Sequence, residues 1–301
     1  MSVIVPLDEA FSATAMLWVY ELKGSGRPRS VPKEGLEGVW PEPPFYYLFY
    51  GTESLESILE WLESRPDWRL TSRYCLPYER WQDISIPQIR LGSFVIRLST
   101  GPADMPDIPD GIAIRLDPGI VFGSGLHPTT QGCLLAISEI FGRNEIHTAV
   151  DFGAGTGILA AACALAGAKS VLAIDRNPLA LKISSKNARA NGVSGRIAFV
   201  EADRLQVVGI RPDLLIMNLE WPILEKILAE GEWRTAGRIV LAGFLESRLE
   251  PVKRFVRPGF LVENLIVREG WPTVTLSRGR QSRRRDLDAP RGGRIVSHSR
   301  T

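Results

Sequence analysis

The sequence of 301 residues contains few cysteines and no long apolar run. Its three cysteines, Cys75, Cys133 and Cys163, are far apart without CxxC spacing, which argues against a disulfide framework and a zinc site, and no metal is expected. We expect them to be small core residues. No segment approaches the roughly eighteen apolar residues of a membrane span, and the start, MSVIVPLDEAF, lacks the positive region of a secretion signal. A soluble cytoplasmic protein without membrane contact is therefore expected.

The charge is unevenly distributed. Residues 278–301 hold eight arginines and two aspartates, a charge of +6, and since the whole chain carries +2, the remainder carries −4. This basic tail lacks apolar periodicity, so we predict a disordered extension that is dispensable for folding. The alternative is weak contact with RNA through its arginines; without Phe, Trp or Tyr for base stacking, sequence-specific recognition is not indicated.

The first part of the chain is predicted to form a small α+β domain. Residues 17–22 and 45–51 are strand-like and flank a loop rich in proline and glycine. A helix is predicted from about Ser54 to Arg65, with its apolar face formed by Leu55, Ile58, Leu59 and Leu62. Residues 99–110, STGPADMPDIPD, are dense in turn formers. These observations predict an N-terminal domain at 1–98, a linker at 99–116, a larger domain at 117–277 and the tail at 278–301.

Strand-like and helix-like segments alternate in the larger domain. Helices are predicted at residues 158–166, followed by Gly167, and at 178–190, with Asn177 as the N-cap. Such alternation predicts an α/β fold with a doubly wound, mostly parallel sheet. Because the last two apolar runs have no helix between them, we expect an antiparallel hairpin at one edge. The seven apolar runs are residues 147–152, 170–175, 196–201, 213–218, 237–243, 260–268 and 272–277.

The stretch VDFGAGTG, residues 150–157, puts Gly153, Gly155 and Gly157 between the first of these strands and a helix. Ligands of open α/β sheets bind beyond the carboxyl ends of the strands, and a glycine turn lets the backbone approach them. Asp175 ends the next strand, where a carboxylate can accept both hydroxyls of a ribose. A nucleoside ligand is therefore predicted.

The identity of the nucleoside stays open at this level. Gly155, Gly157 and Ala160 also fit the loosened dinucleotide fingerprint, which allows a nicotinamide-dependent oxidoreductase, and a tight structural turn is a further reading. However, polar residues end four consecutive strands, as S-adenosyl-L-methionine requires for its amino acid, ribose, adenine and methyl acceptor. No oxidoreductase-like catalytic set is evident in residues 213–243. The predicted cofactor-binding residues at these strand ends are Asp151, Gly153, Gly155, Gly157, Asp175, Asp203 and Asn218.

Five segments together resemble the ribosomal protein L11 methyltransferase family over about residues 78–277. They are DPGIVFGSGLHPTT (117–130), VDFGAGTGILA (150–160), AIDRNPLAL (173–181), NARANG (187–192) and DLLIMNLEWP (213–222). FGSGLHPTT is the most specific of them. The resemblance implies a Rossmann-like, S-adenosyl-L-methionine-dependent enzyme that methylates lysine side chains and an N-terminal amine of a ribosomal protein, with the N-terminal domain recognising that protein.

The resemblance also assigns roles to single residues. It implies that Thr130 binds the cofactor, that Gly153 approaches the methionine portion, that Asp175 holds the ribose and that Asn218 lines the transfer site. Glu220, two residues further on, is a candidate to assist catalysis or to attract a cationic acceptor. From the local sequence alone, Thr129 and Thr130 could instead form the first turn of a helix that begins at Pro128, with His127 packing nearby.

The sequence departs from the family in parts that would face the substrate. The loop NLEWP is one residue shorter than the family's NIL-x-x-P, the region before Tyr78 matches poorly, and the arginine-rich tail is an addition. An RNA or small-molecule methyltransferase is therefore an alternative, although the NPPY-type run typical of base methylation is absent. A catalytically idle binding protein is a further one. We expect a monomer.

Overall fold

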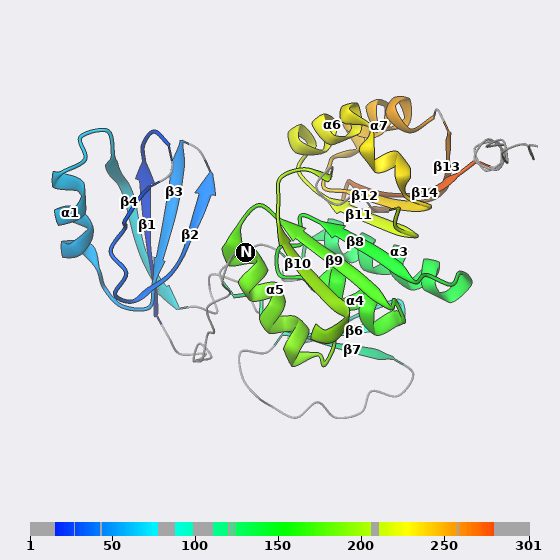
Figure 1. Ribbon diagram of the computed structural model, residues 1–301, viewed down its shortest axis with the longest axis horizontal. Coiled ribbons are helices and arrows are strands. Elements are labelled where there is room, and N and C mark those ends of the chain that lie inside the picture. The colour runs from blue at the N-terminus through cyan, green and yellow to red at the C-terminus, as the bar shows by residue number, and fades with distance from the viewer. Residues whose placement is uncertain are drawn as a thin grey trace, which may run out of the picture.

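Seven strands form the central sheet in the order β10-β9-β8-β11-β12-β14-β13 (Figure 1). The computed structural model describes residues 16–26, 28–42, 44–77, 88–98, 111–119, 121, 123, 125–205, 211–257 and 259–279. The first five strands in the sheet order run parallel, and β14 lies antiparallel between β12 and β13. The strands are β8 (Thr148–Phe152), β9 (Ser170–Asp175), β10 (Ile197–Glu201), β11 (Leu214–Asn218), β12 (Arg238–Ala242), β13 (Phe260–Arg268) and β14 (Trp271–Arg278).

Helices cover both faces of this sheet, which confirms the predicted doubly wound fold. On one side lie α3 (Pro128–Arg143), α4 (Ile158–Ala166) and α5 (Pro178–Ala190), and on the other α6 (Trp221–Glu230) and α7 (Leu249–Val256) (Figure 1). The bounds of α4 and α5 agree with the prediction, and the Asn177 side chain caps α5 by accepting the Leu179 N–H at 3.0 Å. Within the described residues, no helix has the length and apolarity to cross a membrane.

The two faces of the sheet bury separate apolar cores. Seven residues of α4 are buried, mostly alanines, whose small side chains let the helix pack closely on β8 and β9. On the opposite face, fully buried Trp233 fills the space under α6 and donates its indole N–H to the Leu228 carbonyl at 3.0 Å. Cys133 and Cys163 are buried in the first core as expected, whereas Cys75 is exposed, contrary to expectation.

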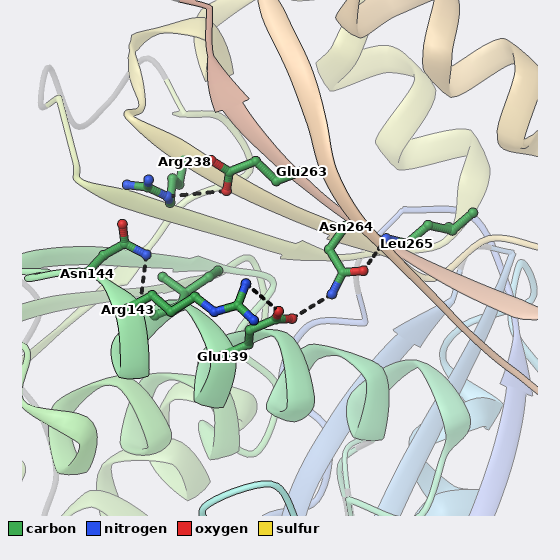
Figure 2. A network of polar contacts seen from close by, with 8 residues as sticks. Glu139, Arg143, Asn144, Arg238, Glu263, Asn264 and Leu265 are labelled. Carbon is green, nitrogen blue, oxygen red and sulfur yellow. Dashed lines mark hydrogen bonds and ion pairs between the residues drawn. The ribbon is translucent and has the colours of Figure 1, made fainter.

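A polar network holds the edge hairpin β13–β14 against α3 (Figure 2). A bulge in β13 between Val262 and Asn264 shifts the register of the strand. The Asn264 amide donates to Glu139 of α3 at 2.6 Å, and Arg143 pairs with the same carboxylate at 2.9 Å. Because β13 and β14 pair antiparallel, the predicted hairpin is confirmed. Its second strand continues to Arg278, which the sequence prediction assigned to the tail; residues 280–301 lie outside the described part of the chain.

A second sheet of four strands, in the order β2-β3-β1-β4, forms the N-terminal domain. One face carries α1, which packs over Tyr20, Leu48 and Tyr50. Two strands were not predicted: β2 lies inside the supposed loop, and β4 has mostly exposed side chains without a clear alternation. The elements are β1 (Met16–Lys23), β2 (Leu36–Glu42), β3 (Phe45–Tyr50), α1 (Leu55–Glu63) and β4 (Arg69–Pro77).

The predicted apolar face of α1 is confirmed in part, because Leu55, Ile58 and Leu62 lie in or against the cluster that contains Tyr20 and Leu48. Ile58 and Trp61 are its buried residues, whereas Leu59 is 47% exposed. Trp61, which the prediction did not include, meets Trp68 edge-to-face with the ring centroids 5.7 Å apart and so joins the core, whereas Leu59 does not.

A third, three-stranded sheet crosses the predicted domain boundary. Strands β5 (Gln88–Leu91) and β6 (Phe94–Leu98), expected in the N-terminal domain, pair with β7 (Ile112–Leu116), which lies in the expected linker. Phe94, Ile96 and Ile114 are fully buried in the core that contains α3 and α4. We therefore propose that the larger domain, defined by the seven-stranded sheet, includes residues 88–98 and begins between β4 and β5.

Candidate active site

The site lies where the sheet changes its direction of winding. From β8 the chain steps outward through β9 to β10, then returns to form β11 on the other side of β8. At such a switch point the connections leave the sheet on opposite faces and open a crevice beyond the carboxyl ends. The loop after β8 carries the glycine turn, β11 ends at Asn218, and Glu220 lies in the loop after β11.

Two glycines of the turn are required by their surroundings. Gly153 has φ +83° and Gly157 has φ +78°, in the left-handed region that side chains disfavour. A Cβ atom at Gly153 would collide with the Leu219 side chain, and one at Gly157 would lie 3.0 Å from the Ser184 Cα. The first contact brings the β8 turn against the β11 loop, and the second seats the turn on α5.

Asp175 joins the glycine turn to the start of α5. Its Oδ2 accepts the Gly155 N–H at 2.9 Å, and its Oδ1 accepts the Asn177 N–H at 2.9 Å. Burial raises the pKa of this carboxyl above its usual range, against the lowering effect of these hydrogen bonds. A carboxylate has about four acceptor positions, so two partners leave capacity for the two hydroxyls of a ribose.

Asp151 is buried below the turn, with only 1% of its surface exposed. Its Oδ2 accepts the Ala160 N–H at 3.0 Å, whereas its Oδ1 has no hydrogen-bond partner among the described residues. Burial raises the pKa of Asp151 to about 7, and the negative charge of Asp175 acts in the same direction. An unsatisfied buried carboxylate oxygen is costly and favours a donor from a ligand. The site therefore fits an amino group next to a ribose.

Thr130 and Asn218, predicted from distant parts of the sequence, meet in the structure. The Asn218 amide lies 3.4 Å from the buried Thr130 hydroxyl, at the position of a long hydrogen bond. His127 and Thr129 contact each other at the start of α3, as the alternative interpretation of this segment as a helix start predicted. His127 caps α3, with its Nδ1 3.3 Å from the Thr129 N and 2.8 Å from the Thr129 Oγ1.

Two of the predicted site residues, Asp203 and Glu220, are exposed and follow the carboxyl ends of β10 and β11. Asp203 follows β10, is exposed, and has the Arg204 guanidinium 4.0 Å away. The chain there runs beside β9, because the Ala202 N–H donates to the Asp175 carbonyl at 3.1 Å. Glu220 is exposed and precedes α6 without capping it. Neither carboxylate joins the contacts described above, so their roles stay predictions.

The asparagines of NARANG have a positioning role that the sequence analysis missed. Asn187 of α5 is 1% exposed; its amide donates to the carbonyls of Asp117 and Thr156 at 2.9 Å, and its Oδ1 accepts the Asp117 N–H at 2.9 Å. Asn191, one turn later, bonds the Arg115 N–H and carbonyl at 2.8 and 2.6 Å. The spacing of four residues puts both on one helix face, which was the available signal. They tie the segment before FGSGLHPTT to the glycine turn.

The fold and the site together define a Rossmann-like enzyme of the methyltransferase class. The family model described as "Ribosomal protein L11 methyltransferase (PrmA)" matches residues 79–279, and the chain belongs to this family. A ribosomal protein L11 methyltransferase of Alteromonas mediterranea is 31% identical over 90% of this chain and 94% of its own length. One of Methylococcus capsulatus is 32% identical over 88% and 92%. These relatives favour the methyltransferase reading over the nicotinamide-dependent one.

A solved structure agrees with this assignment. The crystal structure of a ribosomal protein L11 methylase from Lactobacillus delbrueckii subsp. bulgaricus has a TM-score of 0.57 and 28% sequence identity. It covers 64% of this chain and 99% of its own. The likeness therefore concerns the greater part of the chain.

Replacing Asn187 by alanine should destabilise the fold. The substitution leaves three buried backbone groups of Asp117 and Thr156 without their partner, and we expect a loss of roughly 3 kcal/mol or more in the free energy of unfolding. Urea denaturation measures it. Ser185→Ala removes a hydroxyl that accepts a hydrogen bond from Arg189 on the surface of α5; it is the control and should change stability by less than about 0.5 kcal/mol. An equal loss of stability in the two variants would contradict the role of the Asn187 hydrogen bonds.

The raised pKa of Asp151 predicts a pH dependence of stability. An unfolded aspartate titrates near pH 4, so between about pH 4 and 7 the folded chain holds a proton that the unfolded chain has released. Rising pH in this window therefore destabilises the folded state through Asp151. Asn cannot ionise, so the free energy of unfolding of Asp151→Asn should fall less than that of wild type as the pH rises from 5 to 8. Denaturant titrations at each pH measure it. Parallel pH profiles of the two proteins would show that burial does not perturb this carboxyl.

Proposed function

We propose that this protein transfers a methyl group from S-adenosyl-L-methionine to an amine of ribosomal protein L11, on a lysine side chain or at the N-terminus. The names of the relatives support the protein substrate. The observation that carries the proposal is the contact of Asn218 with Thr130, opposite a glycine turn whose carboxylates fit an amino acid and a ribose. We further propose that the protein is a monomer that acts on ribosomal protein in the cytoplasm.

The residues around the turn would hold the methyl donor. Asp175 would accept the ribose hydroxyls, Asp151 would face the amino group through its unpaired oxygen, and Gly153 would admit the methionine portion without a side chain in the way. Asp203, on the next strand end, is the candidate for the adenosine side. When bound, the donor supplies a sulfonium-activated methyl group, so this chain needs no strong acid to activate it.

The acceptor side must present a neutral amine. Deprotonating a lysine of pKa near 10.4 at pH 7 costs roughly 4 to 5 kcal/mol, and an apolar environment reduces this cost. Trp221, three residues after Asn218, packs edge-to-face with buried Phe244 with the ring centroids 6.2 Å apart, and the Arg248 guanidinium lies 5.5 Å from its ring; we propose that the apolar part of this ring borders the acceptor. The Asn218 side-chain oxygen would accept an amine N–H and aim the lone pair. Glu220, exposed at the rim, would attract the cationic side chain before it enters.

The test is methyl transfer to a defined substrate. The full-length protein is incubated with isotope-labelled S-adenosyl-L-methionine and either unmodified ribosomal protein L11 or purified ribosomal RNA. Mass spectrometry should locate the label on lysine or N-terminal amines of the protein. Label on RNA alone would contradict the protein substrate and support the RNA alternative.

Asp175→Ala should weaken binding of S-adenosylhomocysteine, the spent donor, by about 1 to 3 kcal/mol, because the ribose hydroxyls lose their acceptor. Isothermal titration calorimetry measures the change. Glu225→Ala, on the exposed face of α6, serves as the control and should bind like wild type. Unchanged affinity of Asp175→Ala would refute the ribose assignment.

A further inference from the structure

The sheet of the N-terminal domain has two apolar faces, and the chain covers them in different ways. Side chains alternate along β1, so that Tyr20 and Leu22 face α1 while Leu17 and Val19 face the opposite side. That second face, with Phe49 of β3, is covered by α5 of the methyltransferase domain, which lies toward the N-terminal sheet (Figure 1). The α5 residues in this cluster are Leu179, Ala180 and Ile183.

The interface is closely packed. Leu17 and Val19 are fully buried, and Leu179 and Ile183 are each 9% exposed. Gly38 of β2 has the Leu179 side chain where its own Cβ would stand, so a side chain at this position would push the sheet away from α5. Gly119 makes room for Ile183 in the same way. Such packing defines one docked arrangement rather than a loose contact.

The covered helix begins at the donor site. Leu179, which packs against Gly38, also donates its N–H to the Asn177 side chain. The Asn177 N–H in turn donates to Asp175, whose other oxygen holds Gly155 of the glycine turn. Direct contacts therefore run from the N-terminal sheet through the first turn of α5 to the carboxylate that would bind the ribose.

From this continuity we propose that docking of the N-terminal sheet on α5 and binding of the methyl donor stabilise each other. A ribose on Asp175 fixes Asn177 and the first turn of α5, and this turn is the platform on which the sheet rests. Coupling of this kind is reciprocal, so undocking the sheet weakens donor binding by the same factor by which donor binding strengthens docking. The inference rests on the proposed function for the donor site but concerns the position of the N-terminal domain.

A substitution confined to the N-terminal domain tests the coupling. Gly38→Trp places a large side chain against Leu179 without changing any residue of the methyltransferase domain. Glu60→Trp adds the same bulk on the exposed surface of α1, away from α5, and is the matched control. In calorimetry, Gly38→Trp should bind S-adenosylhomocysteine at least about fivefold more weakly than wild type, whereas Glu60→Trp should bind equally well.

The position of the domain is followed in the same proteins by spin labels. Cys75 is exposed in the N-terminal domain while Cys133 and Cys163 are buried, so one added cysteine, Lys169→Cys, completes a label pair across the interface. The labelled protein with Lys169→Cys as its only substitution should give a narrow distance distribution, and each variant below is made in this background. Gly38→Trp should broaden it, and saturating S-adenosylhomocysteine should narrow it again.

The possible outcomes separate the two claims. If wild type binds no S-adenosylhomocysteine, the proposed function fails first. If it binds, and Gly38→Trp broadens the distances without weakening binding, the coupling is wrong. Leu17→Glu puts a charge on the same buried face and provides a second way to undock the sheet. Should neither substitution alter the distances, docking on α5 does not hold the domain, and the proposal is overturned.

Discussion

The site depends on one constraint of the topology: after β10 the chain returns across the sheet and adds β11, parallel, on the other side of β8. It puts two strand ends side by side and sends their connections to opposite faces of the sheet, the arrangement at which open α/β sheets bind their ligands. Gly153 packs against Leu219 across this point, and Asn218 reaches Thr130 from α3. Residues that are far apart in sequence thus meet because of topology, and the chemistry of the site follows from which residues end the strands.

Much of the larger domain was predictable because local signals agreed there. Asn177, Pro178 and the following apolar periodicity predict α5 with its bounds, and Gly167 marks the end of α4. The glycine turn and Asp175 predict a nucleoside site for a stereochemical reason, since positive φ and close packing exclude side chains. The resemblance to known methyltransferases added separate roles for Thr130 and Asn218, and the structure shows that the two side chains meet.

The remaining features depend on long-range contacts. The sequence assigns β5 and β6 to the N-terminal domain. In the structure β6 instead pairs with β7, which follows a segment rich in proline. The role of Asn187 is set by backbone groups about seventy positions earlier. Trp61 is buried against Trp68 of the following segment, and Leu17 and Val19 are buried against α5 of the other domain. In each case the partner is invisible to a window of neighbouring residues.

The central claim is that the turn at Gly153–Gly157, together with Asp175 and Asp151, holds the methyl donor. A crystal structure of the full chain soaked with S-adenosylhomocysteine tests it most directly. The claim predicts the ribose hydroxyls on Asp175 and the amino group near the unpaired oxygen of Asp151, with Asn218 facing the thioether. Ligand bound elsewhere, or an empty crevice at saturating concentration, would contradict it.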